Sequence, residues 1–378
     1  MYAIYIDSGQ VSGAEKRAVK LFHELNQSNI SCKLIISKRL LKLFESTKYE
    51  SYLSSENCII VETNFAGKLR EIKKNRHLRK FTGFNKILKK IYHLSLIKTI
   101  ELHCQDVIIL HVFLDHLGAL FIKKRLGKKV IFEISSPDYV SKLKRCKAKD
   151  LVLIDCYHAV SESVYRLTSQ AFPKLDLHKA PIPFFDLDQH ILGESNLFSS
   201  KENIIIFAHR LIPRKNGILF AKVVKEFLRS NSGWTVKIFG HGPQASMIRR
   251  LLDEEISSGR VSVGFKGNIL PDLEKSKIFV SLIEADNYPS QSVMEAMYAG
   301  NALLLSDRGF TKEKFINSNG LLCNLDPTDV LAKLTCLTSD EEKLVEYGSS
   351  SFNFIREKYS KEKYIDHLVR LYKTVGKA

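Results

Sequence analysis

Short apolar runs alternate with longer stretches of helical periodicity along this chain. Gly13 opens one such stretch, in which Val19, Phe22 and Leu25 fall on one helix face. Because strands that alternate with helices form parallel connections, the pattern predicts an α/β fold with helices on both faces of a parallel sheet. The apolar runs of the amino-terminal half cover residues 1–7, 32–37, 58–63, 106–113 and 128–135.

The carboxy-terminal half continues the alternation, and two of its apolar runs end in polar turns. Residues 204–208 run into a basic turn, and residues 277–283 run into the turn Asn287–Gln291. A short helical pattern follows this second turn and stops at Gly300. In open parallel sheets, ligands bind beyond the carboxyl ends of the strands. We therefore expect a binding site at these two turns.

Two prolines mark the expected boundary between two domains. Pro181 and Pro183 break regular structure between the two alternating halves. We place the domains at residues 1–180 and 181–355, and residues 356–378 form a last amphipathic segment. With 378 residues, each domain is long enough to bury a core of its own.

The composition fits a globular protein with 44% hydrophobic and 26% charged residues. The chain has no run of 18 apolar residues, so no transmembrane helix is expected. Its start lacks the basic flank and cleavage site of a signal peptide, which favours a cytoplasmic location. The seven cysteines show no metal-ligand spacing, so we expect reduced thiols and no structural metal.

The formal net charge of +17 is unevenly distributed. Residues 68–98 contain one acidic residue, Glu71. Apolar Leu78, Phe81, Phe84, Ile87, Leu88 and Ile91 interleave with basic Arg79, Lys80, Lys86, Lys89 and Lys90. Such a basic amphipathic helix can lie on an anionic membrane surface, where each cation contributes about 1 kcal/mol. A solvated basic face is the alternative, and nucleic acid is not expected because no recognised binding module accompanies the charge.

The two polar turns carry groups that suit a phosphorylated ligand. Arg210 offers a planar fork and Lys215 a compact charge, a combination that fits a diphosphate. The helix that begins near Ser292 presents free N–H groups and the positive end of its dipole. Glu295, a turn into that helix, can accept hydrogen bonds from vicinal hydroxyls such as those of a ribose. Taken singly, a solvated basic turn and a solvated glutamate explain the same residues.

Five blocks follow one another in a fixed order in the carboxy-terminal half. The blocks are RLIPRKNG (210–217), WTVKIFGHGP (234–243), VSVGFKGNI (261–269), SQSVMEAMYAGNALLLSD (290–307) and NGLLCNLDPTDVLAKL (319–334). They resemble, in turn, the R-L-x-P-x-K-G turn, the strand with a G-x-G-P turn, the V-x-F-x-G strand, the E-A-M-A-x-G segment and the N-G-x-L segment of one enzyme family. The family that these blocks resemble comprises the GT-B-fold retaining glycosyltransferases of family 4, or glycosyl transferases group 1.

The resemblance implies two Rossmann-like doubly wound domains that face a cleft, with the final helix crossing back onto the first domain. It also implies a retaining, metal-independent hexosyltransferase without a cofactor. Such an enzyme moves a sugar from a nucleotide-diphosphate donor to a glycan or lipid-linked acceptor. We expect a role in surface polysaccharide or lipopolysaccharide biosynthesis, with the protein peripherally associated with the inner face of the membrane.

The resemblance also assigns site residues. The catalytic residues would be Arg210, Lys215 and Glu295, with no metal ligand. Acceptor-side candidates, placed at strand ends, are His111, Ser135 and Ser136. The donor-binding residues would be Gly13, Arg210, Lys215, Gly240, Gly242, Lys266, Asn287, Tyr288, Pro289, Ser290, Gln291, Ser292 and Glu295.

One position departs from the family pattern. The family carries two glutamates separated by seven residues, and Asn287 stands at the first position. An amide keeps a donor and an acceptor but loses the negative charge. We expect an altered sugar contact at Asn287. The alternative is a non-catalytic GT-B-like scaffold or partner in a glycan-assembly complex, and a GT-B phosphorylase or epimerase is a weaker third reading.

Overall fold

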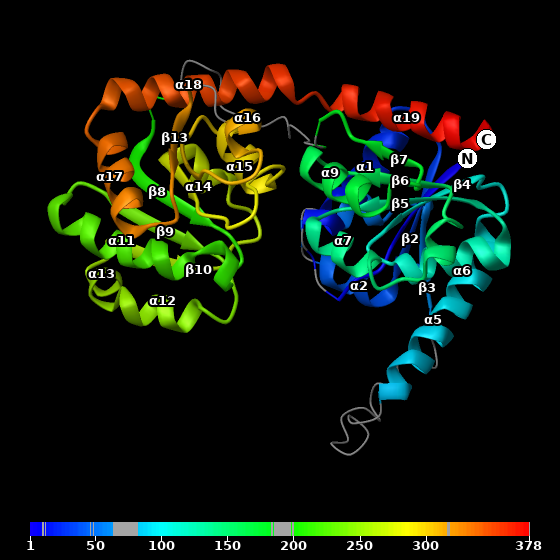
Figure 1. Ribbon diagram of the computed structural model, residues 1–378. Coiled ribbons are helices and arrows are strands. Elements are labelled where there is room, and N and C mark those ends of the chain that lie inside the picture. The colour runs from blue at the N-terminus through cyan, green and yellow to red at the C-terminus, as the bar shows by residue number, and fades with distance from the viewer. Residues whose placement is uncertain are drawn as a thin grey trace. The chain divides into compact units, whose positions relative to one another are not determined.

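The computed structural model divides the chain into two compact units (Figure 1). It describes residues 1–378 except 10, 12, 46, 48, 63–81, 183, 185–197, 199, 316, 317 and 378. The first unit comprises Met1–Ile182 with Glu362–Ala378, and the second comprises Pro183–Lys361. The boundaries expected after residues 180 and 355 therefore fall at Ile182 and Lys361.

The first unit is built on a seven-stranded parallel sheet with the order β3-β2-β1-β4-β5-β6-β7. Its strands are β1 (Tyr2–Ile6), β2 (Cys32–Ser37), β3 (Cys58–Val61), β4 (Ile109–Phe113), β5 (Lys129–Ile134), β6 (Cys156–Ala159) and β7 (Leu177–Lys179). Its helices are α1 (Gly13–Gln27), α2 (Lys38–Phe44), α3 (Glu50–Leu53), α5 (Thr82–His103), α6 (His116–Leu126), α7 (Pro137–Leu143), α8 (Ala148–Leu151) and α9 (Glu162–Ala171). Strands buried on both faces read as continuous apolar runs, which explains the sequence pattern.

The final helix, α19 (Lys361–Lys377), packs on this first unit (Figure 1). The ring of its Tyr372 lies 4.7 Å from the ring of Tyr2, measured between centroids. The return of the last helix to the amino-terminal domain is thus confirmed. The buried face of α19 consists of Tyr364, Ile365, Leu368, Leu371, Tyr372 and Val375.

The second unit has a six-stranded parallel sheet with the order β10-β9-β8-β11-β12-β13. Its strands are β8 (Glu202–Ala208), β9 (Thr235–Phe239), β10 (Val261–Gly264), β11 (Ser276–Ser281), β12 (Ala302–Ser306) and β13 (Gly320–Cys323). Its helices are α11 (Gly217–Ser230), α12 (Ala245–Leu251), α13 (Asp253–Ser257), α14 (Leu270–Lys275), α15 (Gln291–Tyr298), α16 (Thr311–Phe315), α17 (Pro327–Thr338) and α18 (Glu341–Lys358). Both units therefore have the predicted doubly wound architecture.

The strand order of each sheet reverses at one point. In the second unit the reversal lies between β8 and β11, and in the first it lies between β1 and β4. Connections leave such a pair of strands in opposite directions, so a crevice opens beyond their carboxyl ends, where doubly wound sheets bind ligands. The two polar turns singled out in the sequence follow β8 and β11, the strands on either side of this reversal.

The basic segment is described only in part. Residues 68–81 lie outside the described residues, as do the side chains of residues 82–87. From Leu88 onward α5 exposes Lys90, Leu94, Lys98 and Leu102, which follow one another at four-residue intervals. Side chains four residues apart share a helix face, so these four form one exposed stripe. None of the helices in the described ranges combines the length and hydrophobicity needed to cross a bilayer.

Candidate functional site

The turn after β8 is fixed by backbone hydrogen bonds to the neighbouring strand. The amide of His209 donates to the carbonyl of Phe239 at 3.0 Å, and that of Leu211 donates to His241 at 2.9 Å. A short 3-10 helix, Pro213–Lys215, follows, and Asn216 adopts a left-handed conformation before α11 begins. The Asn216 side chain donates to the carbonyl of Leu282 at 2.9 Å. This bond ties the turn after β8 to the segment after β11, across the strand-order reversal.

Arg210 and Lys215 place two positive charges on this turn. Arg210 is exposed and Lys215 is half-buried. Neither forms an ion pair with a carboxylate in the part of the chain that the structure describes. Burial, together with the charges of Arg214 and Arg210, lowers the pKa of Lys215 to about 8. Cations that are crowded together without a carboxylate favour an anionic ligand, because the ligand relieves their mutual repulsion.

Gly240 and Gly242 have a packing role that the sequence did not suggest. A Cβ atom on Gly240 would lie 1.9 Å from the carbonyl oxygen of His209. At Gly242, with φ +151, it would lie 2.4 Å from the carbonyl oxygen of Leu211. Only glycine allows the turn after β9 to approach the turn after β8 this closely. Both residues thus support the backbone that carries Arg210.

Lys266 differs from the other two predicted cations because its charge is paired. Its ammonium lies 2.7 Å from a carboxylate oxygen of Asp272, and Lys237 lies 2.8 Å from the other oxygen. Lys266 also follows β10, which is the edge strand of the sheet. In the strand order β10 lies two strands away from β8, the strand that precedes Arg210 and Lys215, and a role for Lys266 in donor binding remains a prediction.

Asn287 is fully buried, and its amide is saturated by hydrogen bonds within the protein. Ser281 donates to its Oδ1 at 2.6 Å. Its Nδ2 lies 3.1 Å from Ser306 Oγ and 3.3 Å from Thr311 Oγ1. These bonds join the segment after β11 to the last residues of β11 and β12 and to the start of α16. In this conformation Asn287 positions the loop through bonds within the protein, and a contact of its side chain with a sugar remains a prediction.

The remaining turn residues divide into a packed part and an accessible part. Tyr288 is buried, with its ring 5.3 Å from that of Phe315, whereas Pro289, Ser290 and Ser292 are half-buried. Ser290 precedes α15 and makes no side-chain capping bond to it among the described residues. Since the first N–H groups of a helix have no intrahelical partner, the start of α15 can receive an anion.

Two further predicted residues lie on α15 itself. Gln291, its first residue, donates from Nε2 to the carbonyl of Phe184 at 3.0 Å, so its side chain is occupied. Glu295 lies one turn further on and is half-buried between the buried Met294 and Ala296. The second unit thus brings Arg210, Lys215, the start of α15 and Glu295 onto two connected loops and one helix.

The acceptor-side prediction is corrected for His111. It lies in the middle of β4, opposite Ile4 and Ile131, and is 1% exposed. The strand continues past it through two more buried residues, so His111 lies within the sheet and not at its carboxyl edge. Ser135 and Ser136 do follow β5 at that edge and are half-buried.

Gly13, the last predicted donor residue, is the exposed first residue of α1. It belongs to the first unit. A role for it in donor binding remains a prediction.

Lys201 supports the site, although no sequence pattern points to this role. Its buried ammonium donates to the carbonyls of Leu273 and Glu274 at 3.2 Å, Ser276 at 2.7 Å and Ala299 at 2.8 Å. It thereby joins the carboxyl ends of α14 and α15. A single lysine among many gives no sequence signal of such a role, because its partners are backbone atoms far away in the chain.

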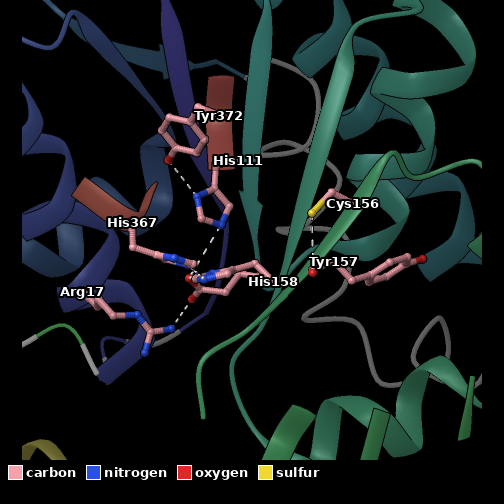
Figure 2. Close-up of polar contacts among 8 residues, drawn as sticks. Arg17, His111, Cys156, Tyr157, His158, His367 and Tyr372 are labelled. Carbon is pink, nitrogen blue, oxygen red and sulfur yellow. Dashed lines mark hydrogen bonds and ion pairs between the residues drawn. The ribbon is translucent and has the colours of Figure 1, made fainter. Parts of the chain in front are cut away.

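A second polar cluster, in the first unit, also went unnoticed in the sequence. His111, Glu133 and His158 lie on the adjacent strands β4, β5 and β6, and Arg17 of α1 pairs with Glu133 (Figure 2). Burial alone would raise the pKa of Glu133, but Arg17 outweighs it and holds the pKa at about 2. Burial lowers the pKa of His111 to about 3.

Comparison with known proteins shows a sequence similarity that covers most of the second unit. Residues 188–353 match the family model of the glycosyl transferases group 1. A poly(ribitol-phosphate) α-N-acetylglucosaminyltransferase of Staphylococcus aureus (strain COL) is 25% identical over 177 residues. That match covers 45% of this chain and 35% of the relative, so it spans about a third of the relative's length.

Solved structures match the whole chain. Anabaena Alr3699/HepE, solved with UDP and glucose, superposes with a TM-score of 0.72 at 11% identity and covers 98% of this chain and 99% of that one. A mutant form of S. aureus TarM, in complex with fondaparinux, α-GlcNAc-glycerol and UDP, gives 0.70 at 12% identity, with 98% and 99% covered. At this identity the likeness shows the fold. The chain therefore has the GT-B fold, and its residues 188–353 match the family model of the glycosyl transferases group 1.

Proposed function

We propose that this protein is a retaining glycosyltransferase of family 4 that takes a hexosyl group from a nucleoside-diphosphate sugar. The observation that carries the proposal is the pair Arg210 and Lys215, which has no carboxylate partner in the described residues and lies at the strand-order reversal of a group 1 domain. A diphosphate supplies the negative charge that this pair lacks.

In the proposed reaction, the two cations stabilise the diphosphate as the glycosidic bond breaks. Negative charge grows on the leaving phosphate in that step, and fixed charges aimed at developing charge are usually the largest catalytic contribution. The free N–H groups at the start of α15 add to this stabilisation. Glu295 binds the ribose hydroxyls. Since two side-chain cations and a helix terminus fill the role, no catalytic divalent ion is needed.

Pro289, Ser290 and Ser292 would line the sugar pocket, because they are the accessible part of the turn. Asn287 would hold that turn in place through its bonds to Ser281, Ser306 and Thr311. Ser135 and Ser136 stay candidates for the acceptor side.

The names of the similar proteins suggest the substrates. Alr3699/HepE and TarM were solved with UDP, and the curated relative transfers N-acetylglucosamine to poly(ribitol phosphate). We infer a UDP-hexose or UDP-N-acetylhexosamine donor and a glycan or lipid-linked acceptor, in surface polysaccharide or lipopolysaccharide assembly. The protein would work in the cytoplasm at the inner face of the membrane, with α5 near the lipid.

The second candidate is a non-catalytic GT-B-like scaffold. Asn287 favours it, because the residue at the position of the family's first glutamate is buried and its side-chain amide is hydrogen-bonded within the protein. The two candidates differ in turnover. The enzyme transfers the sugar and releases nucleoside diphosphate when acceptor is added, whereas the scaffold binds the nucleotide sugar without cleaving it.

The test is a thermal-shift screen of the full chain against UDP, GDP, ADP, CMP and dTDP sugars without added metal. A ligand that binds only the native state raises its apparent stability. We expect one nucleotide to raise the Tm, Arg210→Ala to abolish the rise, and Lys266→Ala to leave it, because the charge of Lys266 is already paired. If no nucleotide sugar raises the Tm of the folded protein, the proposed donor site is wrong. If a nucleotide sugar binds but no nucleoside diphosphate is released once acceptor is supplied, the scaffold is favoured.

A further inference from the structure

Three side chains of metal-ligating type converge inside the first unit. They come from adjacent parallel strands: His111 from β4, Glu133 from β5 and His158 from β6. The Glu133 Oε2 atom lies 3.7 Å from Nε2 of His111 and 3.7 Å from Nδ1 of His158. All three ligand atoms lie within 4.8 Å of one another. In Figure 2 the imidazoles of His111 and His158 point to a common centre, whereas Cys156 lies apart.

The three facing atoms are buried without hydrogen-bond partners. Among the described residues, His111 Nε2, Glu133 Oε2 and His158 Nδ1 have no hydrogen-bond partner and meet only one another at 3.7 Å, and their side chains are at most 1% exposed. A buried polar atom without a partner costs about 1–3 kcal/mol. Three such atoms that face one another therefore indicate an occupant at their centre.

The outward atoms of the same side chains are all occupied (Figure 2). His111 Nδ1 lies 2.9 Å from the Tyr372 hydroxyl, and His158 Nε2 lies 3.2 Å from Nε2 of His367. Arg17 donates to Oε1 of Glu133. When the outward histidine nitrogens carry the protons, the inward nitrogens present lone pairs. Partners that fix the tautomer and ring orientation in this way surround metal-ligating histidines.

We propose that His111, Glu133 and His158 bind a first-row divalent metal ion, in the first place Zn²⁺. Two imidazoles and one carboxylate form a ligand set that Zn²⁺ prefers. Ligand atoms about 2.1 Å from a tetrahedral ion lie about 3.4 Å apart, so the observed separations need only a small closure of the side chains. The Arg17 charge opposes the ion and lowers its affinity.

The ion would be structural. The ligands are buried, so no substrate reaches them. Their outward partners His367 and Tyr372 belong to α19, and Arg17 belongs to α1. Ion binding would therefore couple three strands to the returning helix. The inference is independent of the proposed transferase function, since the ion takes no part in donor binding.

The test uses the full chain with the exposed thiol of Cys336 replaced by Ser, so that a surface site adds no background. After dialysis against a chelator, the apo protein is titrated with Co²⁺ and with Zn²⁺. We expect stoichiometric visible Co²⁺ absorption, displaced by Zn²⁺, and a rise in Tm with Zn²⁺. The absence of both from folded protein would overturn the proposal and leave a water molecule or a proton as the occupant.

Variants locate the ion. Glu133→Gln and His158→Gln should abolish the Co²⁺ absorption. Tyr372→Phe, which removes only the hydroxyl bonded to His111, should weaken affinity about 10–100-fold. The matched control is His178→Gln, because His178 is half-exposed and pairs with Asp176 in the second His-containing cluster. If His178→Gln loses the ion while Glu133→Gln keeps it, the site is elsewhere and the proposal fails.

Discussion

At the residue scale, Lys215 combines a lowered pKa with the absence of a carboxylate partner among the described side chains. Its pKa is about 8 because burial and two neighbouring arginines disfavour the ammonium form. Diphosphate binding favours that form. In the absence of ligand, the charged fraction of Lys215 therefore falls as the pH rises through 8, and diphosphate affinity should fall with it.

The affinity for UDP should thus decrease about tenfold between pH 7 and pH 9, measured by isothermal titration calorimetry. The Lys215→Arg protein is the control, because arginine stays charged over this range and any titration of the nucleotide itself affects both proteins equally. Parallel pH profiles for the two proteins would contradict the placement of Lys215 at the phosphates.

Lys215→Ala should lower turnover at least about a hundredfold, which corresponds to a loss of about 2.7 kcal/mol of transition-state stabilisation.

A substitution of Asn287 tests whether its side chain holds the loop after β11 in place or contacts the donor sugar directly. Truncation in Asn287→Ala leaves buried Ser281, Ser306 and Thr311 without this partner, so the free energy of unfolding should fall by about 1–3 kcal/mol. Urea unfolding measures it, with Asn353→Ala at an exposed helix position as the control. If Asn287→Ala unfolds like the parent but loses affinity for the donor sugar, the side chain contacts the sugar instead.

At the scale of elements, α15 depends on what holds its two ends. Its start carries the proposed phosphate site, and its carboxyl end is bonded through Ala299 to Lys201. The same ammonium binds three carbonyls around the end of α14. A lysine that serves four carbonyls substitutes for the caps that helix ends otherwise need.

Replacing this lysine in Lys201→Met should lower the free energy of unfolding by about 2–3 kcal/mol, because the buried carbonyls lose a charged donor. The same change in Lys222→Met, at an exposed position of α11, should have little effect. Equal unfolding curves for both variants would show that water replaces the ammonium at the helix ends.

How far the sequence predicts these elements depends on whether their signals are local. Strands buried on both faces were readable as apolar runs, and the turns after β8 and β11 were readable from Pro213 and from Asn287–Gln291. The predicted position of His111 at the end of a strand was wrong, because a polar imidazole in an apolar run resembles the residue that ends a strand. In the structure His111 is buried within β4 and hydrogen-bonds to Tyr372, a residue from the other end of the chain. Spacing rules find metal ligands that are close in sequence, and this cluster draws one residue from each of three strands.

At the scale of the whole molecule, the charge of +17 calls for partners of opposite sign. On the first unit, α5 carries part of this charge in the stripe of Lys90, Leu94, Lys98 and Leu102. Leu94 and Leu102 are 47% and 61% exposed. Alternating lysine and leucine on one exposed face suit an anionic lipid surface, where the leucines enter the interface and the lysines meet the head groups.

Neutralising Lys86, Lys89 and Lys90 to glutamine should therefore weaken binding to anionic vesicles at least about tenfold, since each cation near such a surface contributes about 1 kcal/mol. Vesicle sedimentation measures this at low and at physiological salt, and the difference between parent and variant should shrink as salt screens the charges. The control neutralises Lys144, Lys147 and Lys149, which are exposed on the same unit and change the net charge equally. If both triple variants lose the same affinity, net charge alone attracts the protein to the vesicle. If neither loses any, α5 does not bind the membrane, and its basic face is simply solvated.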